Sequence, residues 1–138
     1  RDFCLSRGLG DVYKRQVCMS GYKELKVYKR SYKAAKAIYE MTVGFPNEEM
    51  YGITNQLRRA ALSIPLNIAE GYAKRESQEE FKRFLMMALG SSNEVLVLID
   101  FSKDVGYISD EKHRKAFAEY EEIASMLNSF IQSVKTKV

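Results

Sequence analysis

Apolar residues recur at every third or fourth position in four long stretches of the 138-residue chain. The stretches cover residues 22–43, 48–72, 77–105 and 109–136, with short polar segments between them. Such spacing puts the apolar side chains of each stretch on one face of an α-helix. Long amphipathic helices joined by short turns pack antiparallel against one another. The sequence therefore predicts an all-α fold, an antiparallel up-down four-helix bundle over residues 21–138.

Each predicted helix has its own apolar stripe, which we expect to form the core. The first stripe is Leu25, Tyr28, Tyr32, Ala35 and Tyr39, widened by Val27, Ala34, Ile38 and Met41. The second is Ile53, Leu57, Ala60, Ala61, Ile64 and Ile68. The third is Phe81, Phe84, Leu85, Ala88, Ser92, Val95, Leu96 and Ile99. The fourth is Phe117, Tyr120, Ala124, Leu127, Ile131 and Val134.

Three local signals refine the helix limits. Asn47 follows a Gly-Phe-Pro turn and can cap the second helix. Pro65 lies inside that helix and predicts a kink or short break near residues 61–64. Ser77 and Glu80 form a capping box, in which each side chain accepts a hydrogen bond from the other residue's amide.

The first 20 residues differ from the rest, because they show neither helical nor alternating periodicity. Residues 6–16 resemble a translated sequencing adaptor, so we expect residues 1–20 to be a non-native or disordered segment, in which residues 1–18 are the artefact and Met19 is a plausible start. A genuine N-terminal arm is the alternative. Cys4 and Cys18 both lie here, so we expect no disulfide and no Cys-ligated zinc in the bundle.

Composition suggests where the protein resides. A domain without cysteines is compatible with the cytoplasm. No run of about 18 apolar residues is evident, and no hydrophobic signal segment either. We therefore expect a cytoplasmic protein with no membrane contact.

The two middle helices carry apolar residues outside their main stripes. Contiguous exposed apolar patches usually mark an interface. We expect a homo-oligomer, with Gly90 allowing close approach of a second copy; a skewed bundle that buries wider faces is the alternative. The expected interface residues are Leu62, Leu66, Met87, Leu98 and Phe101.

Two adjacent motifs carry a family resemblance. Residues 56–75 read QLRRAALSIPLNIAEGYAKR, and residues 77–95 read SQEEFKRFLMMALGSSNEV. They closely resemble the S23 family, the four-helix-bundle proteins encoded within intervening sequences of bacterial 23S ribosomal RNA genes. The resemblance covers about residues 22–134, and Tyr28 stands where the family often has Trp. The matching residues are Arg58, Arg59, Asn67, Glu70, Gly71, Arg75, Ser77, Phe81, Phe84, Gly90, Ser91 and Glu94.

The resemblance implies an antiparallel bundle that assembles as a ring-like homopentamer. The family is also similar to the accessory variability protein of diversity-generating retroelements, a pentamer that binds nucleic acid and partners a reverse transcriptase. No enzymatic activity is established for the family. RNA or DNA, a reverse transcriptase or another protein are therefore the partners that the resemblance suggests, besides further copies of the chain.

Charge is concentrated at the first helix. Residues 21–43 hold six basic and two acidic residues, a net +4, whereas residues 44–138 sum to −2. A positive face repeated around a ring would attract a polyanion. The candidate contacts are Lys23, Lys26, Lys29, Arg30, Lys33, Lys36, Arg58, Arg59, Lys74 and Arg75.

Each charged or aromatic candidate has a structural alternative. Lysines on an amphipathic helix are often merely solvated. Tyr22, Tyr28, Tyr32 and Tyr39 could stack on unpaired bases or belong to the core. Arg58 or Arg59 could contact phosphate or form ion pairs with Glu70, Glu80 or Glu94. Asn67, Glu70 and Ser91 could likewise serve function or fix helix register.

Catalytic signatures are missing from the sequence. His113 is the only histidine, and we expect it to be a solvent-exposed surface residue. No metalloprotease, P-loop or nucleophile-elbow motif occurs, so we expect neither a metal nor a cofactor. The sequence thus predicts a non-catalytic oligomer that binds nucleic acid as an accessory protein; a protein-interaction scaffold without nucleic-acid contact is the alternative.

Overall fold

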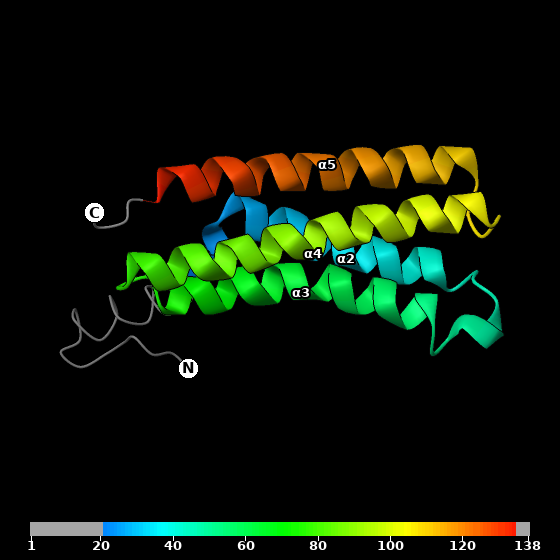
Figure 1. The fold of residues 1–138 in the computed structure, drawn as a ribbon, viewed down its shortest axis with the longest axis horizontal. Coiled ribbons are helices and arrows are strands. Elements are labelled where there is room, and N and C mark those ends of the chain that lie inside the picture. Colours follow the sequence, from blue (N-terminus) through cyan, green and yellow to red (C-terminus); the bar gives the residue numbers. More distant parts are fainter. Residues whose placement is uncertain (1–20, 135–138) are drawn as a thin grey trace.

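The computed structural model describes residues 21–134, so the predictions for residues 1–20 and for the helix end near Thr136 lie outside it. Four α-helices form an antiparallel bundle, and the described residues contain no strand (Figure 1), which confirms the predicted fold. In chain order the elements are η1 (Gly21–Glu24), α2 (Lys26–Thr42), η2 (Asn47–Glu49), α3 (Ile53–Ala73), α4 (Gln78–Asp104) and α5 (Asp110–Ser133).

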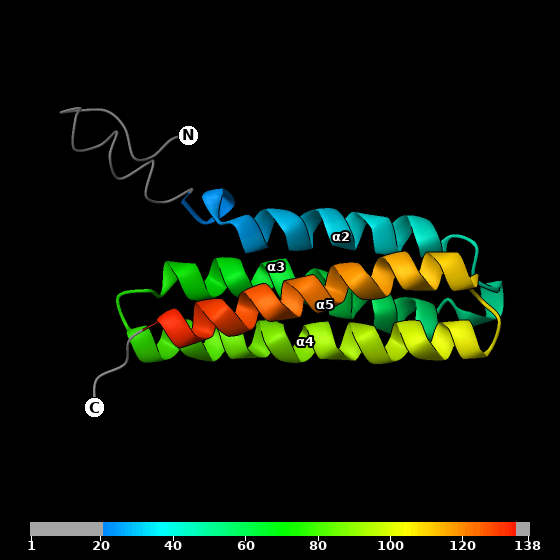
Figure 2. The same cartoon turned by 90° about the horizontal axis from the view of Figure 1, so that it is seen from above.

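The helices do not pack equally. α4 contacts α3 and α5 along most of its length, and α2 packs mainly on α3. The contact between α2 and α5 is the least extensive of these pairs, and α2 lies at one side of the bundle (Figure 2). The predicted stripe of α3 is buried throughout, as is that of α4 except for half-buried Leu96.

The stripe of α2 differs from the prediction. Its buried residues are Val27, Ser31, Ala34, Ala35, Ile38 and Thr42. Tyr32 and Tyr39 are exposed instead, because they lie at the margin of the face that α3 covers. Periodicity located the correct side of the helix but made the apolar face too wide.

The start of α3 also differs. Asn47 does not cap it, because residues 47–49 form the separate helix η2 and α3 begins at Ile53. The Glu49 carboxylate lies at the new start, where its Oε1 accepts from the Ile53 amide at 3.4 Å. Pro65 causes no break: α3 continues through it, with Ile64 and Ile68 fully buried on either side. Core packing on both sides of Pro65 outweighs the missing backbone donor.

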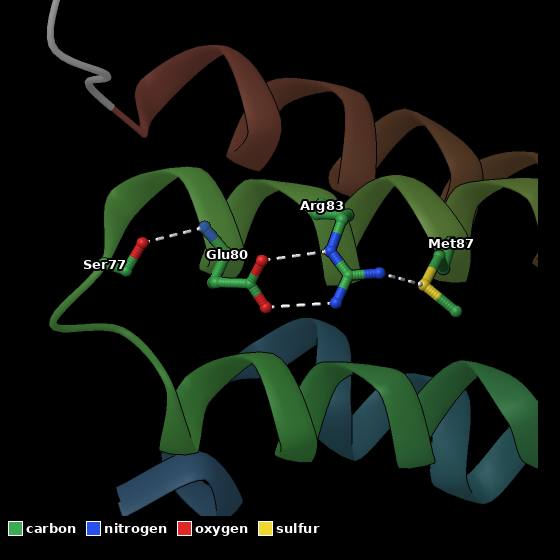
Figure 3. A network of polar contacts seen from close by, with 4 residues as sticks. All are labelled: Ser77, Glu80, Arg83 and Met87. Atoms are coloured by element: carbon green, nitrogen blue, oxygen red, sulfur yellow. Dashed lines mark hydrogen bonds and ion pairs between the residues drawn. The ribbon is translucent and has the colours of Figure 1, made fainter.

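Half of the predicted capping box forms at α4. Ser77 Oγ accepts from the Glu80 amide at 3.2 Å (Figure 3). The Ser77 amide donates to the Lys74 carbonyl instead, at 3.0 Å. The Glu80 carboxylate is thereby left for Arg83, which donates to it at 3.2 and 3.0 Å (Figure 3). These hydrogen bonds hold the pKa of Glu80 below its usual value.

By length and composition, α4 could cross a membrane, with a mean hydropathy of 1.5 over its most apolar window. The window is not an unbroken apolar run, since it includes polar residues, and the absence of membrane contact stays a prediction. One third of that window, 33%, is buried within the bundle. Phe81, Leu85 and Ile99 are among the buried residues of α4, and α4 packs on both α3 and α5, so it is the central helix of the core.

Candidate nucleic-acid interface

The outward side of α2 carries a line of lysines. Lys26, Lys29, Lys33 and Lys36, here called the basic row, are all exposed. They follow one another at three- and four-residue intervals, so they share a face of the helix. Ser31, Ala34 and Ile38 are buried on the opposite side, which fixes the basic row in solvent. Lys23 in η1 is exposed just before the row begins.

Arg30 was predicted with these lysines but is engaged elsewhere. Its guanidinium donates to both carboxylate oxygens of Glu119 on α5, at 2.7 and 3.2 Å. The hydrogen bond from Arg30 to Glu119 raises the pKa of Arg30. Lys29 Nζ lies 3.9 Å from Glu24 Oε1, an exposed and loose pair. Within residues 21–134, Lys26, Lys33 and Lys36 form no ion pair, whereas Glu119 matches the charge of Arg30.

Tyrosines flank the basic row on the side of α3. Tyr32 is 49% exposed and Tyr39 is 40% exposed, so the interpretation of these two as core residues is wrong. Tyr22 and Tyr28 are half-buried, with ring centroids 5.0 Å apart. Tyr28 stacks on Tyr32 at 5.9 Å. Burial of Tyr28 raises its pKa, and the neighbouring phenols add to the shift.

Arg58 joins α3 to α2 without the acidic partner that was considered. Its Nε donates to Thr42 Oγ1 at 2.7 Å and its Nη2 to the Tyr39 carbonyl at 3.3 Å. The guanidinium also lies 4.6 Å from the centroid of the Tyr39 ring. Arg58 binds these groups because the last turn of α2 places the Thr42 hydroxyl and the Tyr39 carbonyl within hydrogen-bond distance of its guanidinium. Arg59, one residue on, is exposed.

The other two basic candidates lie at the end of α3. Arg75 donates to the Tyr72 carbonyl at 2.9 Å and lies 4.1 Å over the Tyr72 ring. Lys74 Nζ lies 5.6 Å from the Phe84 ring. Tyr72 contacts η1, since a Cβ on Gly21 would lie 2.7 Å from its hydroxyl. Arg75 therefore packs on a tyrosine that contacts η1 and does not belong to the basic row.

The shared motif residues concentrate where α3 meets α4. Ser63 Oγ and Ser91 Oγ are 2.8 Å apart, and Asn67 Nδ2 donates to the Ser63 carbonyl and hydroxyl at 2.8 and 2.9 Å. Gly71 is buried, and a Cβ there would lie 2.8 Å from Phe84 Cβ. Polar pairing and close approach thus fix the register of these helices. Glu70 and Glu94 are exposed, and no ion pair is formed by either within residues 21–134.

The residues predicted to form an oligomer interface are divided by the structure. Leu66 is 63% exposed on α3, and Phe101 is 54% exposed on α4, where Met87 is also exposed. Leu98 is half-buried against the core, and Leu62 is half-buried between α2 and α3. A Cβ added to Gly90 would meet no atom of a neighbouring element within 4 Å, so its surroundings are open.

The outward side of α4 is more apolar than the sequence analysis recognised. Its exposed large residues are Met86, Met87, Val97, Phe101 and Val105, here called the apolar face of α4. Met86 and Val97 were overlooked as interface residues. The available signal was that Met86 lies four residues before Gly90 and Val97 four residues before Phe101.

His113 is not the exposed surface residue that was expected. Its Nε2 lies 2.8 Å from Asp100 Oδ1, and its ring stacks on Phe117 at 5.3 Å. The side chain therefore links α5 to α4. Between residues 21 and 134, no group of three or more His, Cys, Asp or Glu side chains is placed to hold a metal ion.

Comparisons with known proteins agree with this architecture. The model of the family described as 23S rRNA-intervening sequence protein matches residues 23–129. The chain is also similar to the crystal structure of a protein of unknown function from the S23 ribosomal protein family of Bacteroides thetaiotaomicron VPI-5482. The two are 25% identical with a TM-score of 0.69, over 78% of this chain and 99% of that chain. No curated protein matches the chain.

Proposed function

The chain belongs to the family of 23S rRNA-intervening sequence proteins, and from that premise we propose that it is a non-catalytic, oligomeric accessory protein that binds nucleic acid. The observation that carries the proposal is the basic row of α2. Its four lysines are exposed on one helix face. Lys29 has only the loose pair with Glu24, whereas Glu119 matches the charge of Arg30 beside them. A line of exposed ammonium groups is suited to a phosphate backbone, which it binds without reading sequence.

Binding of this kind depends on salt. Each lysine that neutralises a phosphate releases condensed counterions, so affinity falls as salt rises. Four contacts to a single strand give a slope of about −3 in a plot of log affinity against log salt, from about −0.7 per contact. The slope therefore measures how many lysines of the basic row are used.

Self-association is the second part of the proposal. The apolar face of α4 and Leu66 of α3 would be exposed to water in an isolated chain. Covering them with further copies removes that cost. The resemblance to the S23 family suggests five copies, which would repeat the basic row around a ring, and a reverse transcriptase as one possible protein partner.

The experiment is a titration of the full chain with labelled single-stranded RNA, structured RNA and duplex DNA at several salt concentrations, with molar mass measured by light scattering. Charge reversal of Lys26, Lys33 and Lys36 to Glu should abolish binding. A matched control reverses Lys103, Lys112 and Arg114, which are also exposed but lie on α4 and α5. Equal loss in both variants, or no binding by the unaltered protein at low salt, would refute the proposal.

A protein-interaction scaffold without nucleic-acid contact is the second candidate. The observation that favours it is the apolar face of α4, which is suited to a protein partner rather than to phosphate. The same charge reversal separates the two functions, because it should leave binding of a protein partner intact. Replacing Phe101 with Glu should instead impair the scaffold and the assembly.

A further inference from the structure

A hollow of about 330 Å³ opens between α2 and α3, directly beside the basic row. It is here called the tyrosine hollow. Ala35 and Leu62 supply apolar surface in it, and Tyr32 and Tyr39 lie seven residues apart along the same helix. Its lining is Tyr32, Ala35, Lys36, Tyr39, Glu40 and Leu62. Its volume is at the lower end of the range for ligand pockets, which fits a group the size of one aromatic ring system.

Both tyrosine rings are exposed yet held in place. Tyr32 stacks against Tyr28 at 5.9 Å, so one side of its ring is supported. Arg58 lies 4.6 Å from the Tyr39 ring while it donates to the Tyr39 carbonyl at 3.3 Å. Rings that are already positioned lose little freedom when a flat group stacks on them.

Positive charge lies next to the tyrosine hollow. Lys36 belongs both to its lining and to the basic row, and its Nζ is 5.9 Å from the Tyr32 ring centroid. Lys33 is exposed one turn earlier. A ligand that places an aromatic ring in the hollow and an anionic group over the lysines would use both features.

We infer that the tyrosine hollow receives an unpaired nucleobase, so that the basic row binds single-stranded rather than duplex nucleic acid. The inference rests on the proposed function and names its substrate class. A base stacked in a duplex keeps its faces covered, whereas an unpaired base can stack on an aromatic side chain. The phosphates on either side of that base then lie over Lys33 and Lys36.

Glu40 gives the tyrosine hollow a preference among bases. It lines the hollow one helical turn beyond Lys36, and an ionised carboxylate only accepts hydrogen bonds. Cytosine and adenine carry an exocyclic amino donor, whereas uracil and thymine have a carbonyl oxygen in its place. Single strands rich in cytosine or adenine should therefore bind more tightly than strands of uracil or thymine, in both RNA and DNA.

The test measures binding of short labelled oligonucleotides to the full chain. The probes are cytidine and uridine strands, their DNA counterparts, and a duplex RNA of the same length. Replacing Tyr32 and Tyr39 with Leu should weaken single-strand binding at least about fivefold, from the loss of base stacking. The slope against log salt should stay unchanged, because no phosphate contact is removed. The matched control is Tyr51→Leu, since Tyr51 is 95% exposed and lies outside the hollow.

A second measurement does not depend on variants. Photo-crosslinking of a strand with 5-iodinated cytosine to the unaltered protein should label Tyr32 or Tyr39, identified by mass spectrometry. Unchanged single-strand affinity in the double variant, tighter binding of the duplex, or crosslinks only elsewhere would overturn the inference while leaving the proposed function intact. Failure of the unaltered protein to bind any probe would instead remove both.

Discussion

Two helix pairs of this bundle differ in how closely they pack: α3 with α4, and α2 with α5. Between α3 and α4, Gly71 brings the backbones close and Ser63, Asn67 and Ser91 form a connected set of hydrogen bonds. Between α2 and α5 the structure leaves an opening of about 370 Å³, here called the α2–α5 seam. Its lining includes Ala34, Ala37, Ile38, Met41, Ala116 and Tyr120.

The same kind of residue has different effects in the two places. Small side chains bring α3 and α4 together, whereas the alanines of the α2–α5 seam leave space because the helices do not close over them. Tyr120 is buried there, and its hydroxyl has no hydrogen-bond partner among the described residues. Burial raises the pKa of this phenol well above its ordinary value. α2 is thus held mainly by α3, and its remaining surface is left for lysines and tyrosines.

The largest expected change in stability is at the close contact between α3 and α4. Gly71→Ala puts a Cβ 2.8 Å from Phe84 Cβ and 3.3 Å from Phe81 Cδ1, so α3 and α4 must move apart. We expect a loss of about 2 kcal/mol in unfolding free energy, the usual cost of overpacking. Urea denaturation followed by circular dichroism measures it at a fixed protein concentration.

Gly90→Ala is the control for that change. Gly90 is also helical, but within one chain its surroundings are open, so the added methyl should stabilise the monomer by about 0.5–1 kcal/mol. If both glycine variants changed stability in the same direction, the close approach at Gly71 would not be the cause.

Removing a hydroxyl should lower the unfolding free energy at the contact of α3 with α4 and raise it at the contact of α2 with α5. Ser63→Ala breaks the bond to Ser91 and one bond from Asn67, and we expect a loss of about 1 kcal/mol. Tyr120→Phe removes a buried hydroxyl that has no partner among residues 21–134, and we expect a gain of about 1 kcal/mol. Thermal and urea unfolding of both variants check the signs.

The burial of Tyr120 also predicts that the stability of the protein changes at alkaline pH. Its pKa is raised from the ordinary tyrosine value of 10.0, so above about pH 10 the unfolded chain loses this proton while the folded chain keeps it. Stability should therefore fall as pH rises through that range. The fall should be smaller in Tyr120→Phe; an identical pH profile would show that this phenol is not protected by burial.

Filling the α2–α5 seam with a larger side chain tests whether the space between these helices exists in solution. Ala116→Leu adds apolar volume where space already exists, so it should stabilise the protein by up to about 1 kcal/mol. A loss comparable to that of Gly71→Ala would mean that the seam is closed in solution. Hydrogen exchange of α2 amides gives an independent measure, since a filled seam should slow it.

The smallest effect concerns the ion pair across the α2–α5 seam. Arg30→Gln removes the two hydrogen bonds to Glu119. Because both side chains are partly exposed, we expect a loss of only about 0.5 kcal/mol, which disappears at high salt. A larger, salt-independent loss would show that this pair is a major attachment of α2.

The sequence predicted the helices and the buried stripes of α3 and α4 well, because those helices are covered on both sides. Ile64, Leu85 and Ile99 are completely buried as the pattern indicated. The sequence predicted the buried stripe of α2 less well. Periodicity gives the direction of a side chain, but it does not show how far the neighbouring helix extends over that side chain. Tyr32 and Tyr39 lie just beyond that coverage.

The candidate site was predictable to a similar degree. The basic row follows from spacing alone, because lysines opposite a buried stripe must face solvent. The partners of Arg30 and Arg58 do not follow from spacing, since Glu119 is 89 residues away in the chain and Thr42 is 16 residues away. Only the packing of α2 between α3 and α5 brings those groups within hydrogen-bond distance.

The length of the basic row determines how the protein would hold a nucleic acid. From Lys26 to Lys36 it extends about 15 Å along α2, at 1.5 Å per residue. With about 3.4 Å of helix axis per phosphate of each strand in a duplex, this length corresponds to only about four stacked nucleotides, and to fewer in an unstacked single strand. One subunit alone would bind such a strand weakly and briefly. In a ring, each bound subunit raises the effective concentration of the strand near the next one, so affinity would come from avidity and would disappear on dissociation into monomers.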